Sequence, residues 1–217
     1  GYIQCGEDVF VTWCSGHLLE PCNPEAYQPQ YAKWSLHDLP IAPLEWRLKP
    51  RSEAMNHLNI LAPLLEDADE VIHAGDPDRE GQWMVDQVLN HFNVKKPVLR
   101  LLISDLTPQS IAHALEQLQP NTEYRNLSHS AQCRQQADWL YGINLTRALT
   151  LLARKNGKEG LYSVGRVQTP VLGLIVKRDQ EISQFTPTRY FTIHAQFDVF
   201  NTEATPPQAI NAAWQTP

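Results

Sequence analysis

The chain has 217 residues, of which 42% are hydrophobic and 19% are charged, and its formal net charge is −6. This length allows one large domain or two small ones with a buried core, and the absence of an apolar run of about 18 residues excludes a membrane-spanning helix. No charged-then-apolar leader and no C-x-x-C pair is visible, so we expect a soluble cytoplasmic protein whose 4 cysteines are free thiols.

Strand-like and helix-like segments alternate in the first half of the chain. The expected elements are, in order, a strand over 9–13, a helix over 52–66, a strand over 70–74, a helix over 83–92 and a strand over 98–103. Thr107 and Pro108 then open a third helix, with threonine as the N-cap and proline at the first helical position. Strands that alternate with helices are typical of a parallel sheet covered by helices, so the pattern predicts an α/β fold.

The pattern becomes mainly helical after about residue 125. The expected elements are a long helix over 126–154 with a bend at Gly142, a loop over 156–165, a helix from Thr169-Pro170 to Ile182 and a strand over 190–195. The apolar stripe expected on the long helix consists of Ala137, Leu140, Tyr141, Leu145, Ala148 and Leu152. We therefore expect one domain over 1–125 and a second region over 126–217, helical to about residue 185.

An acidic run, Asp76-Pro77-Asp78-Arg79-Glu80-Gly81, follows the strand over 70–74. In open α/β sheets, the carboxyl ends of the strands form the edge at which ligands bind. The three carboxylates of the run repel one another, and a hard cation such as Mg²⁺ needs only one or two carboxylates from a protein. The run therefore predicts a magnesium site whose ion orients phosphate oxygens. The alternative is an exposed acidic turn in which Glu80 caps the next helix.

Charge is divided unevenly along the chain. Residues 1–133 carry nine Lys/Arg against eighteen Asp/Glu, whereas residues 134–178 carry eight Lys/Arg against two acidic residues. A basic stretch of this kind suits nucleic-acid phosphates, and a solvated helix face is the alternative. Before the helix that Pro170 opens, Gly165 permits close backbone approach and Arg166 offers a bidentate donor. These residues indicate an anion-binding loop, with a plain loop before a capped helix as the alternative.

Matching segments occur in the order of one known family from about residue 2 to residue 194. The segment over 73–82 resembles the D-x-D-x-E-G motif of Toprim domains. The other matching segments are residues 11–13, 16–20, 39–41 with Pro43, 105–108, 137–144 and 163–172. Together they resemble the type IA DNA topoisomerases, in the form found in bacterial topoisomerase III. The resemblance implies a Toprim Rossmann-like parallel sheet followed by a mainly α DNA-binding region.

The resemblance also implies roles for particular residues. Asp76 and Asp78 match the Mg²⁺ ligands, and Glu80 matches a catalytic carboxylate that moves a proton or shapes the metal site. The residues that match a single-stranded DNA site are Trp34, Trp139, Arg147, Arg154, Ser163, Val164, Gly165, Arg166, Val167 and Gln168. Because Arg147 and Arg154 are two helical turns apart, we expect them on one helix face away from much of the apolar stripe. Trp34 and Trp139 are also compatible with core tryptophans.

The function that the resemblance implies is ATP-independent cleavage, passage and religation of single DNA strands through a 5′-phosphotyrosine, with Mg²⁺. The expected substrates are single-stranded, negatively supercoiled or catenated DNA, acted on by a monomer at the bacterial nucleoid. None of the 7 tyrosines has the I-T-Y-P-R context of the family's nucleophile, and the family's E-K-P-S segment would precede Gly1. We therefore expect an N-terminally truncated Toprim domain and no DNA relaxation by this chain alone.

Two other functions are compatible with parts of the sequence. A Toprim primase or nuclease would use the acidic run without a tyrosine, and a non-catalytic remnant would only bind DNA. A covalent 5′-phosphotyrosyl adduct would exclude the primase or nuclease. E-K-P-S and Y-P-R segments on the two sides of this sequence would exclude the non-catalytic remnant. No segment points to a helicase partner.

Overall fold

The computed structural model describes the backbone of residues 1–199 and 208–215 and the side chains of residues 1–195. The chain divides into two compact units, Gly1–Thr169 and Pro170–Pro217. The region predicted over 126–217 includes residues 200–207 and 216–217, which lie outside the described residues. No helix in the described ranges has the length and apolarity needed to cross a bilayer.

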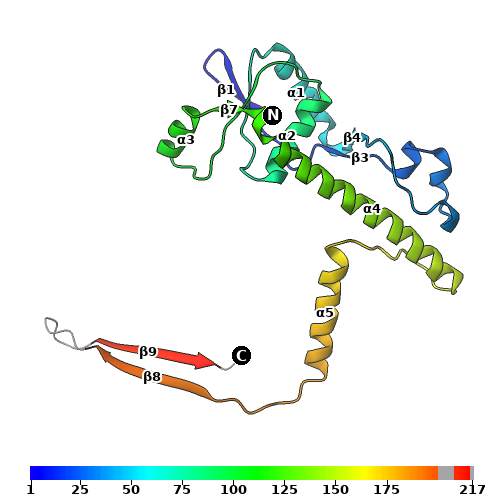
Figure 1. Ribbon diagram of the computed structural model, residues 1–217, viewed down its shortest axis with the longest axis vertical. Coiled ribbons are helices and arrows are strands. Elements are labelled where there is room, and N and C mark those ends of the chain that lie inside the picture. The colour runs from blue at the N-terminus through cyan, green and yellow to red at the C-terminus, as the bar shows by residue number, and fades with distance from the viewer. Residues whose placement is uncertain (200–207, 216–217) are drawn as a thin grey trace. The chain divides into compact units, whose positions relative to one another are not determined.

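The strands of the first unit, all of whose residues are described, form three small sheets (Figure 1). One sheet pairs β1 (Tyr2–Cys5) with β2 (Val9–Thr12), and another pairs β3 (Leu19–Pro21) with β4 (Leu48–Pro50). The third sheet consists of β5 (Val71–His73), β6 (Val98–Arg100) and β7 (Gln119–Pro120). The first two sheets are antiparallel pairs, the first a hairpin and the second formed by strands 26 residues apart. The third sheet is the one that carries the acidic run, because the run begins three residues after β5 ends.

The sheet of β5, β6 and β7 confirms the predicted α/β fold and corrects one detail. β5 and β6 are parallel, with Val71 opposite Val98, and the helix α2 (Arg79–His91) connects them. β7 pairs with β6 in the antiparallel direction, so the sheet is mixed and not wholly parallel as predicted. Residues 101–118, which include the helix α3 (Pro108–Leu115), join β6 to β7 and return to the same end of the sheet, so β7 runs antiparallel to β6.

Five short 3₁₀ helices and four α-helices complete the first unit. The α-helices are α1 (Met55–Asp67), α2 (Arg79–His91), α3 (Pro108–Leu115) and α4 (Arg125–Lys155). The 3₁₀ helices are Pro24–Ala26, Pro29–Ala32, Leu36–Asp38, Ser52–Ala54 and Asn121–Tyr124. Thr107 caps α3 by accepting a hydrogen bond from the backbone of Ser110, as predicted. Asp78, and not Glu80, caps α2, because its carboxylate accepts from the backbone of Gly81.

A hydrophobic cluster joins α1 and α2 to the start of β3. Its buried members are Leu18, Leu19, Ala54, Leu58, Leu61 and Val88, with Cys14, Leu48, Leu65 and Phe92 packed against them. Val88 belongs to α2 and Leu58 and Leu61 to α1, so the cluster holds α2 from one side. Burial of each such side chain contributes about 1.5–3 kcal/mol, which fixes the helix that follows the acidic run.

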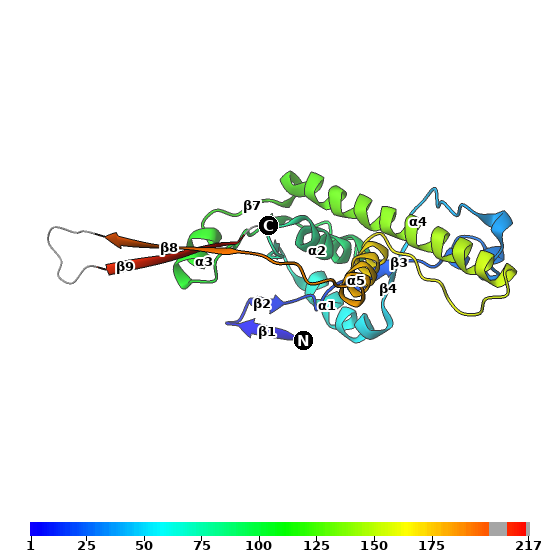
Figure 2. The same cartoon turned by 90° about the horizontal axis from the view of Figure 1, so that it is seen from below.

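The helix α4 is continuous over 31 residues and packs beside α2 (Figures 1 and 2). Both views show α4 without a kink, so the bend expected at Gly142 is not found. A Cβ at Gly142 would lie 3.6 Å from the carbonyl oxygen of Val164, an ordinary contact distance, so the packing there does not require glycine.

The buried face of α4 differs from the predicted apolar stripe. Its buried residues are Ser128, Ala131, Arg147, Thr150 and Ala153. Tyr141, Leu145 and Leu152 of the predicted stripe are between 40% and 46% exposed. The prediction is wrong because α4 contacts α2 along one part and the segment over 161–164 along another, where threonine hydroxyls bind backbone groups.

The second unit contains one helix and one strand pair. The helix α5 (Gln168–Ser183) begins at the end of the first unit, and β8 (Thr192–Val199) pairs with β9 (Gln208–Gln215) in the antiparallel direction. The helix predicted from Thr169-Pro170 to Ile182 and the strand predicted over 190–195 are therefore confirmed. Both ends of the helix and the start of the strand agree to within two residues, and the strand ends later than predicted, at Val199. β9 was not expected.

Candidate metal and nucleic-acid site

The acidic run folds back on itself through two glycines. A Cβ at Gly75 would lie 2.6 Å from the carbonyl oxygen of Gly81, and a Cβ at Gly81 would lie 2.6 Å from the backbone nitrogen of Asp76. Either side chain would therefore collide with backbone. The loop after β5 and the first turn of α2 can approach this closely only because both positions are glycine.

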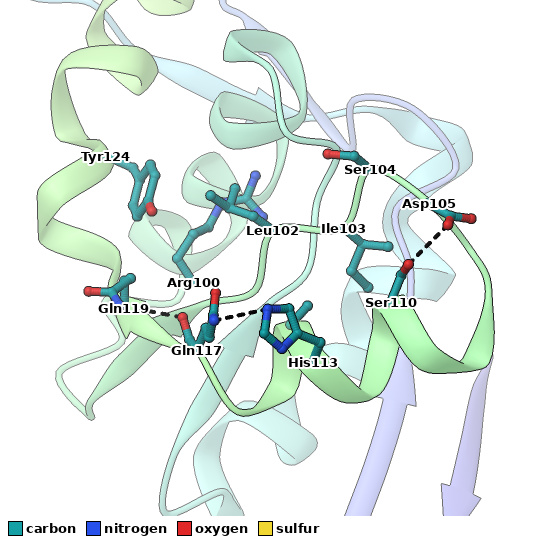
Figure 3. A pocket seen from close by; sticks show the side chains of 11 residues that line it. Arg100, Leu102, Ile103, Ser104, Asp105, Ser110, His113, Gln117, Gln119 and Tyr124 are labelled. Carbon is teal, nitrogen blue, oxygen red and sulfur yellow. Dashed lines mark hydrogen bonds between the residues drawn. The ribbon is translucent and has the colours of Figure 1, made fainter.

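Arg100, at the end of β6, holds this loop from beneath. It is 1% exposed, and it lies within cation–π distance of Tyr124, at 5.9 Å from the ring centroid (Figure 3). Its guanidinium donates to the carbonyl oxygens of Gly75 (2.7 Å), Asp76 (2.7 Å), Leu101 (2.7 Å) and His73 (3.1 Å) and to Oε1 of Gln82 (2.7 Å). A rigid fork of donors thus ties the strand end, the acidic loop and α2 together.

A buried polar network supports Arg100. Gln82 donates from Nε2 to Asp86 (3.0 Å) and to Asn121 (2.8 Å), and Asn121 donates to the other oxygen of Asp86 (2.9 Å). His73 is fully buried; its Nδ1 accepts from the backbone of Gly75 (3.2 Å), so its Nε2 is the donor to the carbonyl of Gln82 (3.1 Å). The carbonyl groups of Gly75 and Asp76 are therefore positioned by contacts that involve neither the Asp76 nor the Asp78 side chain.

Burial lowers the pKa of His73 from its ordinary value of 6.5, and the positive charge of Arg100 lowers it further. An unfolded chain takes up this proton near the ordinary pKa, whereas the folded chain takes it up only at lower pH. Stability is therefore highest above that pH and falls as the pH drops, by up to about 1.4 kcal/mol per unit. In EDTA, urea denaturation should give a lower free energy of unfolding at about pH 5.5 than at about pH 7.5, and His73→Gln should reduce this difference. An equal pH dependence in the variant would contradict the prediction.

Arg100 and Tyr124 also line a cavity of about 380 Å³ between the end of β6 and α3 (Figure 3). The polar groups along its wall bind one another: Ser110 donates to Asp105 at 2.9 Å, and the His113 and Gln117 side chains are 3.0 Å apart. None of the residues predicted to bind metal or DNA lines this cavity.

Asp76 and Asp78 lie at the exposed carboxyl end of β5. One oxygen of Asp78 accepts the cap hydrogen bond from Gly81 at 2.7 Å, which leaves the second oxygen for an ion. Among the described residues, no three His, Cys, Asp or Glu side chains converge as a ligand cage. Two neighbouring carboxylates on a fixed loop nevertheless fit Mg²⁺, because this ion keeps several waters and uses one or two protein carboxylates.

Glu80 begins a chain of ion pairs that leaves the acidic loop. Its carboxylate lies 2.7 Å from Nη1 of Arg134 and 3.8 Å from Nε2 of His17. Arg134 lies one helical turn before Asp138 on α4, with Nε 3.9 Å from Oδ2 of that residue. Asp138 in turn accepts from Nε of Arg166 and from Nη2 of Arg166 at 3.3 Å. The structure thus joins the predicted catalytic carboxylate to the arginine of the predicted anion-binding loop.

Five of the predicted DNA-binding residues line one cavity of about 510 Å³. They are Trp34, Trp139, Arg147, Ser163 and Val164, and Asp138 lines the same cavity. Arg147 is only 5% exposed; it donates to the carbonyl of Tyr31 at 2.7 Å and lies 5.1 Å from the ring centroid of Trp34. Its buried Nε has no hydrogen-bond partner. Burial lowers the pKa of Arg147, partly offset by Glu25 and Asp38.

The other residues predicted on α4 lie in different surroundings. Trp139 donates to the carbonyl of Cys22 at 3.1 Å and packs edge-on against Tyr27 and Trp46, so one edge of its ring is in an aromatic cluster. Arg154 is exposed and does not line the cavity, whereas Arg147 is buried. The two arginines are seven residues apart on one continuous helix and so share a face as predicted, but Arg147 is buried beside Tyr31 and Trp34 whereas Arg154 is exposed.

The predicted anion-binding loop is held along α4. The backbone nitrogens of Tyr162 and Val164 donate to the hydroxyls of Thr150 (3.0 Å) and Thr146 (2.9 Å). The backbone nitrogen of Gly165 donates to the hydroxyl of Thr169 (3.0 Å), which closes the loop onto the start of α5. Arg166, Val167 and Gln168 are exposed.

Several residues of this site were missed from the sequence. They are His17, Gln82, Asp86, Arg100, Arg134 and Asp138. A usable signal existed for three of them: Arg100 is a single arginine in the buried strand over 98–103 and needs partners, and Arg134 and Asp138 are four residues apart and share a helix face. The remaining contacts join residues far apart in the sequence.

Known proteins match this chain over nearly its whole length. Family models match as the Toprim domain over residues 2–106 and as DNA topoisomerase over residues 122–215. DNA topoisomerase 3 from Vibrio cholerae is 52% identical and that from Salmonella typhimurium 50% identical, each over 199 residues that cover 90% of this chain. This chain belongs to the type IA topoisomerases. The family's D-x-D-x-E-G motif then corresponds to the loop that Arg100 holds.

The chain spans about a third of the length of these curated relatives, since the matched residues cover 31% of each. DNA topoisomerase 3 from Bacillus subtilis is 39% identical over 200 residues, which are 91% of this chain and 27% of that protein. The full-length topoisomerase I structure from Thermotoga maritima matches with a TM-score of 0.51 and 22% identity, over 86% of this chain and 29% of that one. That likeness supports the fold of the type IA family alone.

Proposed function

We propose that this chain supplies the Mg²⁺ site and part of the single-stranded DNA site of a bacterial type IA topoisomerase. The enzyme cleaves, passes and religates single DNA strands without ATP, through a 5′-phosphotyrosine. The observation that carries the proposal is the ion-pair chain from Glu80 to Arg166, which joins the acidic loop to the G-R-V-Q loop. The proposed substrates are negatively supercoiled or catenated DNA with single-stranded segments, and the proposed location is the bacterial nucleoid.

In this proposal, Asp76 and Asp78 bind Mg²⁺, and Glu80 is the catalytic carboxylate beside it. Bound Mg²⁺ orients phosphate oxygens and stabilises the negative charge that develops on them. Arg100 and the backbone-to-backbone contact of Gly75 with Gly81 keep the two ligands in place before the ion arrives. None of the chain's tyrosines is proposed as the nucleophile, in agreement with their sequence context.

The DNA strand is proposed to follow the cavity beneath α4 and the loop that precedes α5. Trp34 and Arg147 form a stacked pair on the cavity wall, and such pairs of ring and cation bind bases and phosphates of single strands. Trp139, Ser163 and Val164 also line the cavity, and beyond it the proposed contacts are Arg154, Gly165, Arg166, Val167 and Gln168.

Replacing Arg166 by alanine should weaken binding of a fluorescently labelled oligodeoxythymidine to the 217-residue chain. Because one phosphate contact is lost, the slope of log affinity against log salt should become shallower by about 0.7. Fluorescence anisotropy over a range of NaCl concentrations measures both quantities. Lys158→Ala, an exposed cation in the loop before residue 161, is the matched control and should leave the slope unchanged. An unaltered slope in Arg166→Ala would show that this side chain does not contact a phosphate.

A non-catalytic DNA-binding remnant is the competing function. Relaxation and adduct assays on the longer protein that contains this sequence distinguish an enzyme from a remnant. An enzyme relaxes negatively supercoiled plasmid in the presence of Mg²⁺ and forms a covalent 5′-phosphotyrosyl adduct. DNA binding with neither adduct nor relaxation would support the remnant. An adduct also excludes a Toprim primase or nuclease, which needs no tyrosine.

A further inference from the structure

Four charged side chains alternate in sign between the acidic loop and the G-R-V-Q loop: Glu80, Arg134, Asp138 and Arg166. Their side chains are between 39% and 45% exposed, so water and ligands reach all of them. Every neighbouring pair is of opposite charge. A change of partner at one end therefore alters the partners available to the next residue.

Asp138 holds the arginine that the proposed function assigns to a DNA phosphate. Arg166 donates from Nε and Nη2 to the two oxygens of Asp138, the paired geometry with which a guanidinium also binds a phosphate. The paired side chains have no net charge. While Asp138 is in place, Arg166 is a weaker attractor for a phosphate than a free arginine would be.

Arg134 is placed to respond when Asp138 loses its partner. It lies 2.7 Å from Glu80 and 3.9 Å from Asp138, so it is bound to the first and within reach of the second. Arg134 and Asp138 are four residues apart on α4 and share one face, so their contact can tighten by side-chain rotation alone. Glu80 would then lose its closest cation in the described chain.

We propose that Asp138 occupies the position on Arg166 that a DNA phosphate takes when DNA binds. The phosphate displaces Asp138, which then pairs with Arg134. Glu80 thereby loses Arg134 and is released toward the metal site. Asp138 and Arg134 are positioning residues in this proposal, which rests on the proposed function. DNA binding and Mg²⁺ binding then favour each other, because each requires one end of the same ion-pair chain to open.

Binding of labelled oligodeoxythymidine to the 217-residue chain in EDTA tests the first half of the proposal. Asp138→Asn should raise the affinity about two- to fivefold, the range expected when an exposed ion pair no longer competes. The same substitution in an Arg166→Gln background should give no gain. A general loss of negative charge would raise affinity in both backgrounds, so an equal gain in both would overturn the proposal, as would no gain in either.

Calorimetric titration of the DNA-free chain with Mg²⁺ tests the second half. Arg134→Gln should tighten Mg²⁺ binding severalfold, because Glu80 is free without DNA, whereas Arg125→Gln at the exposed start of α4 should not. Equal affinities in Arg134→Gln and the unaltered chain, or equal tightening in Arg125→Gln, would overturn the release of Glu80. Failure of the unaltered chain to bind the oligonucleotide would overturn the proposed function and this inference together, whereas binding without the Asp138→Asn gain overturns the inference alone.

Discussion

Replacing Asp76 and Asp78 together by asparagine should lower the Mg²⁺ affinity of the chain by at least about tenfold, since even the loss of an outer supporting partner typically costs 10–100-fold. Asparagine keeps the size of each side chain and removes the charge that attracts the ion. It also keeps the N-cap of α2, because asparagine accepts the hydrogen bond from Gly81 as well as aspartate does. Isothermal titration of the 217-residue chain with MgCl₂ measures the effect.

Two further measurements separate loss of the ion from loss of the fold. The free energy of unfolding in EDTA should not fall, because the substitutions remove repulsion between adjacent carboxylates. Binding of oligodeoxythymidine in EDTA should change less than Mg²⁺ binding does, and plasmid relaxation by the longer protein should decrease. Asp69→Asn is the matched control, since this exposed residue lies at the opposite end of β5. Unchanged Mg²⁺ affinity in the double variant, or an equal loss in the control, would remove these residues from the metal site.

Replacing Arg100 by leucine should lower the free energy of unfolding by about 3–5 kcal/mol, the usual cost of removing one member of a buried charged network. The substitution leaves the carbonyls of Gly75 and Asp76 without their donor and empties the space between β6 and α2. Lysine at this position keeps the charge but not the fork, so Arg100→Lys should recover only part of the loss. Urea denaturation of each variant in EDTA gives these values.

The exposed Arg125 at the start of α4 is the control for Arg100. Arg125→Leu should change the free energy of unfolding by no more than about 0.5 kcal/mol, as surface substitutions usually do. Arg100→Lys should in addition weaken Mg²⁺ binding at unchanged charge, because the acidic loop is no longer held. A loss below about 1 kcal/mol in Arg100→Leu would mean that other contacts hold the loop.

The local features of this chain were predictable because their physical causes lie within a few residues. Thr107 and Pro108 mark the start of α3 through one cap hydrogen bond and one fixed φ angle, and both signals are adjacent in the sequence. The placement of the acidic run between β5 and α2 follows in the same way from the apolar pattern on its two sides. Predictions were wrong where the packing of a neighbouring element determines which residues are buried. An example is the buried face of α4, which small and polar residues occupy.

Sequence by itself determined the α/β class, the position of Asp76 and Asp78 directly after β5, and, through resemblance, the family. The tertiary structure alone decided that Arg100 lies beneath the acidic loop, that Arg147 is buried against Trp34, and that Glu80 is joined to Arg166. Periodicity and caps depend on hydrogen bonds across three or four residues, whereas these contacts join residues up to 113 positions apart. Which charged side chain meets which partner is settled only when α2, α4 and the loops between them pack.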